Sequence, residues 1–483
     1  MRRFLPLFGC LAVGGALFAL FGSDGPSGAT RTLRDTGMET SRPTSAPPDL
    51  ADFITGAEAY LRGHPADARI WADLGGAHVE QARRTGDPAH YARARSAFER
   101  SLRLSPEVDA MIGMGALANA RHEFGAARSW GLRARRAAPY RWSLYAVLTD
   151  AYTELGRYGK AERALQRMLD GRPDVASLSR AAHLLRLRGQ TERARAVLQR
   201  TRSMASAPAD LALCDFQLGE LEWGEGRPRE ALRAYGQALT ADPGHAPSFA
   251  GRARAEAALG WTGAAIRDYG AAVARDPGFA AELGELYEYL GQPARAAQQY
   301  AVFAAEHRLM RAKGVADDLE AGRFAADHGD PGSAVRRLSA EWRRRGSVEV
   351  ADALGWALHR AGRDAEAAGY AARAERLGDR DALFAYHRGE IERALGHTTS
   401  ARAHLTRALR INPYFSLQDA PRARQALIEL REAPSPPPPP SPRPPPPSPR
   451  PTETARDGTS GDSPAERTPR VQEGLTAGEH HRA

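Results

Sequence analysis

The sequence predicts an all-α protein, a right-handed superhelical solenoid of about ten helical hairpins. Three regularities support this prediction. Glycines return at intervals of 31 to 38 residues, an alanine stands five residues after each of them, and a large apolar residue follows four positions later in every unit but one. A period of this length is typical of stacked helical repeats. We expect the array to be elongated and exposed.

The repeat is clearest in residues 151 to 173, which read AYTELGRYGKAERALQRMLDGRP. Gly156 suits the left-handed backbone that ends a first helix, and Ala161 lets a second helix approach closely. Leu165 would fill the space to the next unit, and Pro173 would stop the second helix. One such hairpin cannot bury its own apolar face, so neighbouring copies must stack. The glycine series is Gly156, Gly189, Gly226, Gly260, Gly291, Gly329, Gly362 and Gly396.

The period and the residue types resemble the tetratricopeptide repeat, whose pattern is W-x2-L-G-x2-Y, then A-x3-F, then P. The stretch WADLGGAH matches the first half best, with Trp71, Leu74, Gly75 and His78 in the four places. The second half follows as Ala94, Phe98 and Pro106. The resemblance extends over ten units from about residue 66 to residue 413. It implies that the first helix of each unit lines a concave face where peptides bind.

Units seven and eight depart from the pattern. Unit seven is short at its start, both units lack the closing proline, and their junction, AVFAAEHRLMRAKGV, is long. The register of the repeats is therefore open at this point. We expect the whole array to occupy residues 49–431, with capping helices formed by residues 50–65 and by a segment that includes residues 425–430.

The two ends of the chain have different compositions from the array. Two arginines precede an uncharged apolar run from Phe4 to Phe21, which is typical of an export signal. We expect residues 1–29 to be a signal peptide or a membrane anchor; cleavage before Thr30 and retention are both open. Residues 30–48 are expected to be a flexible linker, and residues 432–483 a proline-rich tail that does not fold. The protein is thus expected outside the cytoplasmic membrane, secreted or anchored by residues 4–21.

The charge of the chain is positive but diffuse. The formal net charge is +9, and of the 67 basic residues only Lys160 and Lys313 are lysines, which is typical of arginine codon use in a GC-rich genome. No stretch forms a basic cluster of the kind that binds nucleic acid, so we expect no nucleic-acid partner. The sequence also lacks the common catalytic, phosphate-binding and metal-binding motifs. We therefore expect no enzyme activity, no cofactor and no metal.

A candidate peptide-binding stripe follows from counting back from the glycines of the later units. The residues 13, 10, 6, 3 and 2 positions earlier form one face of each first helix. Aromatic and acidic side chains alternate on this face, which suits a ligand with apolar and basic side chains. The alternative, that the rings pack against the next repeat, stays open. The stripe consists of Phe216, Glu220, Trp223, Glu285, Glu288, Tyr289, Asp352, Trp356, Tyr386 and Glu390.

These patterns together predict a non-catalytic scaffold for protein–protein interaction that assembles or matures an envelope protein complex. One alternative is a cell-wall or surface-tethering protein that uses its proline-rich tail. A second alternative is an enzyme whose motif escapes detection. If the stripe binds the partner, changing Trp223 and Trp356 together to Ala should abolish capture and leave the array folded.

Overall fold

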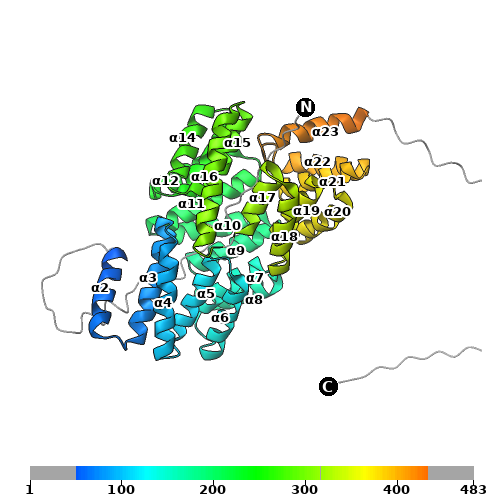
Figure 1. The fold of residues 1–483 in the computed structure, drawn as a ribbon. Coiled ribbons are helices and arrows are strands. Elements are labelled where there is room, and N and C mark those ends of the chain that lie inside the picture. The colour runs from blue at the N-terminus through cyan, green and yellow to red at the C-terminus, as the bar shows by residue number, and fades with distance from the viewer. Residues whose placement is uncertain (1–49, 316, 433–483) are drawn as a thin grey trace, which may run out of the picture. The chain divides into compact units, whose positions relative to one another are not determined.

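The computed structural model describes residues 50–315 and 317–432, and the description below is confined to them. The predicted export segment, linker and proline-rich tail lie outside these residues. Within residues 50–432 no helix is both long and apolar enough to cross a membrane. Figure 1 shows the described part as a succession of helices, from α2 in blue to α23 in orange.

The described residues form 22 α-helices and no strand, which confirms the predicted all-α solenoid of ten hairpins. A helix precedes the first hairpin, α2 (Leu50–Gly63), and another follows the last, α23 (Asp419–Glu432). Units 1 to 5 pair α3 (Ala68–Thr85) with α4 (Ala89–Leu104), α5 (Val108–Ala120) with α6 (Phe124–Ala137), α7 (Ser143–Glu154) with α8 (Tyr158–Gly171), α9 (Val175–Leu187) with α10 (Thr191–Met204), and α11 (Pro208–Gly224) with α12 (Pro228–Ala241). Units 6 to 10 pair α13 (Ala246–Ala258) with α14 (Thr262–Val273), α15 (Ala280–Tyr289) with α16 (Pro293–Ala312), α17 (Asp318–His328) with α18 (Pro331–Arg344), α19 (Val348–Arg360) with α20 (Asp364–Ala374), and α21 (Ala382–Ala394) with α22 (Thr398–Ile411).

The repeated residues do what their positions predicted. Seven of the eight turn glycines have a positive φ, between 66° and 79°. The eight alanines that follow them are at most 3% exposed, which lets the two helices of each hairpin pack closely. The large residue is held between units: the Tyr235 ring lies against Gly219 of its own unit and Gly251 of the next, where any Cβ would overlap it.

The uncertain register of units 7 and 8 has a structural explanation. Unit 7 begins with a short 3-10 helix, η2 (Pro277–Phe279), before α15, and its second helix α16 is 20 residues long. The extra length of α16 accounts for the wide glycine spacing there. In unit 8 the turn glycine, Gly329, has φ −128° and is not left-handed, and the side chain of Asp330 caps α18 instead. A second 3-10 helix, η3 (Glu375–Leu377), follows α20.

The array also closes on itself, which differs from the predicted exposed and elongated arrangement. The turns inside units 2 to 5 pack against the loops after units 7 to 10, and we call this row of contacts the seam. Arg121 Nε donates to Gly314 O at 3.1 Å, Val348 N donates to Tyr158 Oη at 2.9 Å, and Asn412 Nδ2 donates to Trp223 O at 2.8 Å.

The seam needs glycine for a second reason besides the turn. A Cβ at Gly156 would overlap the carbonyl oxygen of Gly346, and a Cβ at Gly189 would overlap that of Gly378. Backbone therefore meets backbone across the seam. At the corresponding turn of unit 1, a Cβ at Gly86 would meet nothing within 4 Å, so the contacts do not continue to unit 1.

Candidate functional site

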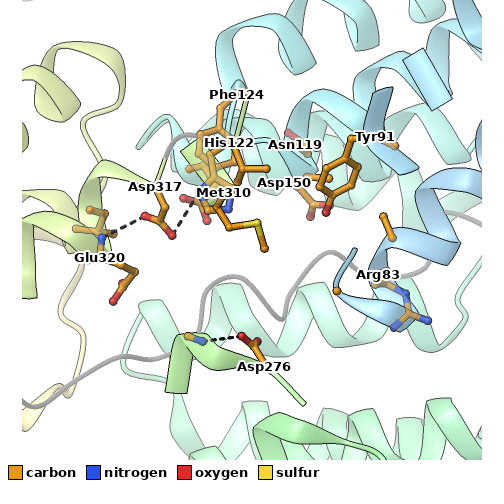
Figure 2. A pocket seen from close by; sticks show the side chains of 18 of the residues that line it. Arg83, Tyr91, Asn119, His122, Phe124, Asp150, Asp276, Met310, Asp317 and Glu320 are labelled. Atoms are coloured by element: carbon orange, nitrogen blue, oxygen red, sulfur yellow. Dashed lines mark hydrogen bonds and ion pairs between the residues drawn. The ribbon is translucent and has the colours of Figure 1, made fainter. Parts of the chain in front are cut away.

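A cavity of about 400 Å³ lies beside the seam, and His122, Asp317 and Arg345 of the seam are part of its lining. We call it the inner cavity. Its first wall comes from α3, the start of α4, α5 with the turn that follows it, α7 and α9. Its second wall comes from η2, α15, α16 and the start of α17, and Arg345 of the loop after unit 8 joins it. In Figure 2, Tyr91, Asn119 and Asp150 lie on one side of the open space and Asp276 lies on the opposite side.

Two buried ion pairs stiffen the first wall. Arg180, only 2% exposed, donates to both carboxylate oxygens of Asp150 at 2.7 Å. Burial raises the pKa of Asp150, and Arg180 opposes that shift. Glu154 contacts Arg345, which comes from the loop after unit 8 and also contacts Glu341. Burial raises the pKa of Glu154 to about 7 in spite of Arg345. These charges are held by their partners.

The second wall has its own local pairs. Asp317 caps α17 by accepting from Glu320 N at 3.1 Å, and it lies 3.6 Å from His122 Nδ1 across the seam. Burial acts to raise the pKa of Asp317, but His122 and Arg345 lower it below the ordinary value. Asp276 accepts from Gly278 N at 2.9 Å and so begins η2. Each carboxylate therefore helps to place a loop.

Two glutamates on the second wall have no arginine or lysine at ion-pair distance among residues 50–315 and 317–432. Glu282 is 8% exposed, and burial raises its pKa to about 7. The charge of Arg254 opposes this shift, but Arg254 already pairs with Glu220 at 2.5 Å. Burial, and then the charge of Asp276, raise the pKa of Glu306. Such carboxylates gain from a cation brought to them.

An amide and an imidazole on the first wall complete the polar lining. Asn119 is 2% exposed; its Nδ2 donates to Val147 O at 3.2 Å, while its Oδ1 has no hydrogen-bond partner among the described residues. Burial lowers the pKa of His183 to about 4, so this ring is neutral at pH 7. An unsatisfied buried acceptor such as Asn119 Oδ1 is costly and suits a donor supplied by a ligand. The part of the chain that the structure describes holds no group of side chains that could bind a metal ion.

The predicted stripe lies elsewhere, mostly inside the packing between consecutive first helices. In unit 9, Asp352 is 2.9 Å from His387 Nδ1. Trp356 Nε1 donates to Asp327 at 2.8 Å, and its ring stacks on His387 with 4.2 Å between centroids. In unit 10, Tyr386 is 1% exposed and Glu390 is 8% exposed.

The stripe residues of units 5 and 7 are also engaged by neighbours. Glu220 accepts from Tyr235 Oη at 2.6 Å. Trp223 is 9% exposed under Arg254, and the Phe216 ring contacts Tyr235 and His245. In unit 7, Glu285 lies 3.4 Å from His328 Nε2 and Glu288 accepts from Tyr300 Oη at 2.8 Å.

Of the ten stripe residues, Tyr289 alone is largely exposed, at 53%. The structure thus places most stripe residues in the packing within and between neighbouring units. The inner cavity lies elsewhere. Peptide binding by the ten residues stays a prediction. The expectation that Trp223 and Trp356 can be removed without harm to the fold is revised, because both rings are buried.

The sequence carries a signal for the inner cavity at an early unit. Counting back 6, 3 and 2 positions from Gly156 gives Asp150, Thr153 and Glu154, and all three line the cavity. The predicted stripe includes only the later units and so misses them. Glu306 and Asn119 could not be found in this way, because their place depends on the second wall and on the turn of unit 2.

Comparison with known proteins identifies the repeat. A family model described as tetratricopeptide repeat matches residues 144–178, and a second model with the same description matches residues 216–278. No curated protein matches the chain. Solved structures similar in fold include a human IFIT1 dimer with PPP-AAAA, at 16% identity over 67% of this chain and 77% of that chain, with a TM-score of 0.43. Others are the type IV pilus biogenesis factor PilW, at 16% identity over 41% and 92% with a TM-score of 0.36, and the APC/C hetero-tetramer Cut9-Hcn1, at 15% identity over 83% and 92% with a TM-score of 0.31.

Proposed function

This chain is a tetratricopeptide-repeat protein, and from that premise we propose that it is a non-catalytic scaffold that holds a segment of a partner protein in its inner cavity. The observation that carries this proposal is the cavity itself. Six of the ten units, units 1 to 4, 7 and 8, contribute to its lining, so a bound segment would contact units that are distant in sequence. Pockets of a few hundred cubic ångströms are large enough to enclose several side chains.

The chemistry of the cavity favours binding over catalysis. Asp150 and Glu154 are held by Arg180 and Arg345, so neither is placed as a free general base. Cys214 is buried, and burial raises its pKa to about 12, which keeps the thiol protonated and a poor nucleophile. These features support a role in which the side chains position a ligand.

The proposed place of action is the outer side of the cytoplasmic membrane, in the assembly or maturation of an envelope protein complex. The support is the uncharged run from Phe4 to Phe21 behind two arginines, which lies outside the described residues. A reporter enzyme that works only in the cytoplasm, fused after residue 60, should be inactive. An active reporter would refute export.

A second candidate function is tethering to the cell wall or surface. The observation in its favour is the run SPPPPPSPRPPPPSPRP from Ser435 to Pro451, which as polyproline II would span about 50 Å at about 3.1 Å per residue. In this alternative the tail, and not the inner cavity, makes the essential contact.

One experiment separates the two candidates. The full chain and a variant lacking residues 433–483 are each used to capture partners from a native envelope fraction, and the fractionation of each is followed. A scaffold should keep its partner without the tail. Loss of the partner together with a change of fractionation would support tethering and contradict the scaffold.

A further inference from the structure

The charges around the inner cavity do not balance. Its lining contains eight carboxylates and three arginines. Each arginine already has a carboxylate partner: Arg83 pairs with Glu80 at 2.6 Å, Arg180 with Asp150 at 2.7 Å, and Arg345 with Glu154. Asp317 lies beside His122, and Glu320 pairs with Arg323 at 2.9 Å. Three carboxylates are left without a cation at ion-pair distance among the described residues, those of Asp276, Glu282 and Glu306.

These three acids belong to one wall. Asp276 begins η2, Glu282 lies on α15, and Glu306 lies on α16. Asp276 and Glu306 are close enough for their charges to repel each other, and Glu282 is largely buried without its own cation. Glu282 alone is buried, whereas Asp276 is exposed and Glu306 is partly exposed. A buried carboxylate without a cation, and two carboxylates that repel each other, are both unfavourable unless an opposite charge joins them. The second wall is therefore a place where a cationic group would be stabilised.

The first wall faces this acidic surface with a different chemistry. Asn119 presents an Oδ1 that has no partner among the described residues, although the residue is only 2% exposed. Around it lie the ring of Tyr91 and the small apolar side chains of Ala116 and Ala120. This wall can accept an N–H from a ligand backbone and pack against an apolar side chain. The second observation thus points independently to a donor-bearing ligand.

We propose that the inner cavity binds a polypeptide segment that presents a lysine or arginine between apolar residues. The basic side chain lies against Asp276, Glu282 and Glu306, a backbone N–H of the segment donates to Asn119 Oδ1, and the flanking apolar side chains pack on the first wall. This assignment rests on the proposed function and names the chemistry of the partner. An anionic ligand fits less well, because all three arginines of the lining are already paired.

The test uses the full chain and a peptide library, because a library offers basic, acidic and apolar segments to the cavity at once. Random twelve-residue peptides displayed on phage are selected on the immobilised protein near neutral pH. A variant with Glu282→Gln and Glu306→Gln removes two of the three unpaired charges with little change of shape. A control variant with Asp52→Asn and Glu99→Gln removes two charges from α2 and α4, away from the cavity. Circular dichroism confirms that all three proteins are folded.

We expect peptides selected on the unchanged protein to be enriched in Lys and Arg at least twofold over the library. Individual selected peptides should bind the cavity variant at least tenfold more weakly and the control variant equally well. Truncating one member of a buried charge pair has effects of this size. Selection without basic enrichment, failure to select any peptide, or equal binding to the cavity variant would each overturn the proposal.

Two further arms separate this proposal from others. A fluorescein-labelled single-stranded RNA of twelve adenosines should bind more weakly than the selected peptides; tighter binding would overturn the peptide assignment in favour of nucleic acid. The cavity variant is also used in the envelope capture experiment. Partner capture that survives the double substitution would leave the scaffold function intact and contradict only the cationic chemistry assigned to the cavity.

Discussion

Units 3 and 10 carry an acid at the same repeat position, six residues before the turn glycine, but the two acids have different surroundings. Asp150 of unit 3 is held by Arg180 and lines open space, because the second wall stands across a cavity of about 400 Å³. Glu390 of unit 10 pairs with Arg393 at 2.6 Å in a region that the last described residues cover. There Phe415, from the loop before α23, packs on Tyr386 with 5.3 Å between ring centroids.

The difference shows that residue type and repeat position do not decide whether an inner-face side chain is available to a ligand. In the late units the polar and aromatic groups of each first helix pair with or pack against the first helix of the next unit, or against the loop before α23. In the early units the opposite wall reaches Glu154 through Arg345 and His122 through Asp317, but it leaves a cavity beside Asp150. Availability therefore depends on tertiary distance, and the predictions below separate packed side chains from available ones.

The largest effect is expected from Trp356→Ala in the late region. Its ring is 3% exposed, stacks on His387 and donates to Asp327, so the change leaves a cavity and removes one of the two donors to Asp327 Oδ1. Removing a buried tryptophan costs about 3 to 5 kcal/mol of unfolding free energy, measurable by urea denaturation. Trp261→Ala is the matched control, because that ring is 47% exposed and its loss should cost less than about 0.5 kcal/mol. Equal effects of the two changes would contradict the distinction.

The next effect concerns the seam, and it compares two glycines at the same place in early and late units. Gly156→Ala should lower the unfolding free energy by about 3 kcal/mol, because left-handed strain of about 1 to 2 kcal/mol adds to overlap with Gly346. Gly362→Ala meets nothing within 4 Å and should cost only the strain. If the two variants have the same stability, the seam does not hold the two regions together in solution.

A smaller effect depends on pH and tests Glu282 of the cavity. Its pKa is about 7 in the folded chain and near the ordinary value of 4.5 when unfolded, so the folded state binds the proton more tightly. The stabilisation is full below pH 4.5 and is lost as pH rises through 7. Between about pH 6 and pH 8 the unfolding free energy of the unchanged protein should fall by about 1 kcal/mol relative to Glu282→Gln. Parallel pH profiles for the two proteins would show that Glu282 is not buried as described.

The smallest effect on stability is expected from Tyr289→Ser. This side chain is 53% exposed, so the unfolding free energy should change by less than about 0.5 kcal/mol. If the predicted stripe contacts a partner, capture from the envelope fraction should nevertheless weaken several-fold. Unchanged capture would show that Tyr289, the one largely exposed residue of the stripe, does not contact the partner.

The fold was predictable because each unit depends on residues close together in the sequence. Gly156, Ala161 and Leu165 lie within ten positions, and their turn, close approach and packing can be inferred from residue type alone. The seam was not predictable, because Tyr158 and Val348 are 190 residues apart and meet only when the curvature of the whole array brings them together.

The same dependence on contacts between distant residues explains why only part of the candidate site was predictable. The acids of the first wall follow from helix periodicity, as Asp150 and Glu154 show. Glu390 pairs with Arg393 and Asp352 pairs with His387, whereas Glu306 has no such partner among the described residues. This difference depends on the length of α16 and on the loop before α23. Those features arise where the repeat is irregular, and the regular pattern carries no information about them.

The seam also sets an order of events for a newly made chain. In an ordinary repeat array each unit can reach its final contacts as soon as its neighbour has formed. Here Tyr158 makes its seam contact only after Val348, 190 residues further along the chain, has been synthesised. At a synthesis rate of about 5 to 20 residues per second, this takes on the order of ten to forty seconds. Until then the turn of unit 3 is uncovered, and the turns of units 4 and 5 stay uncovered until Gly378 and Asn412 emerge. The second wall forms earlier, once unit 7 has emerged. A shortened chain that ends before unit 7 would thus still be helical and yet would lack the second wall and its three acids.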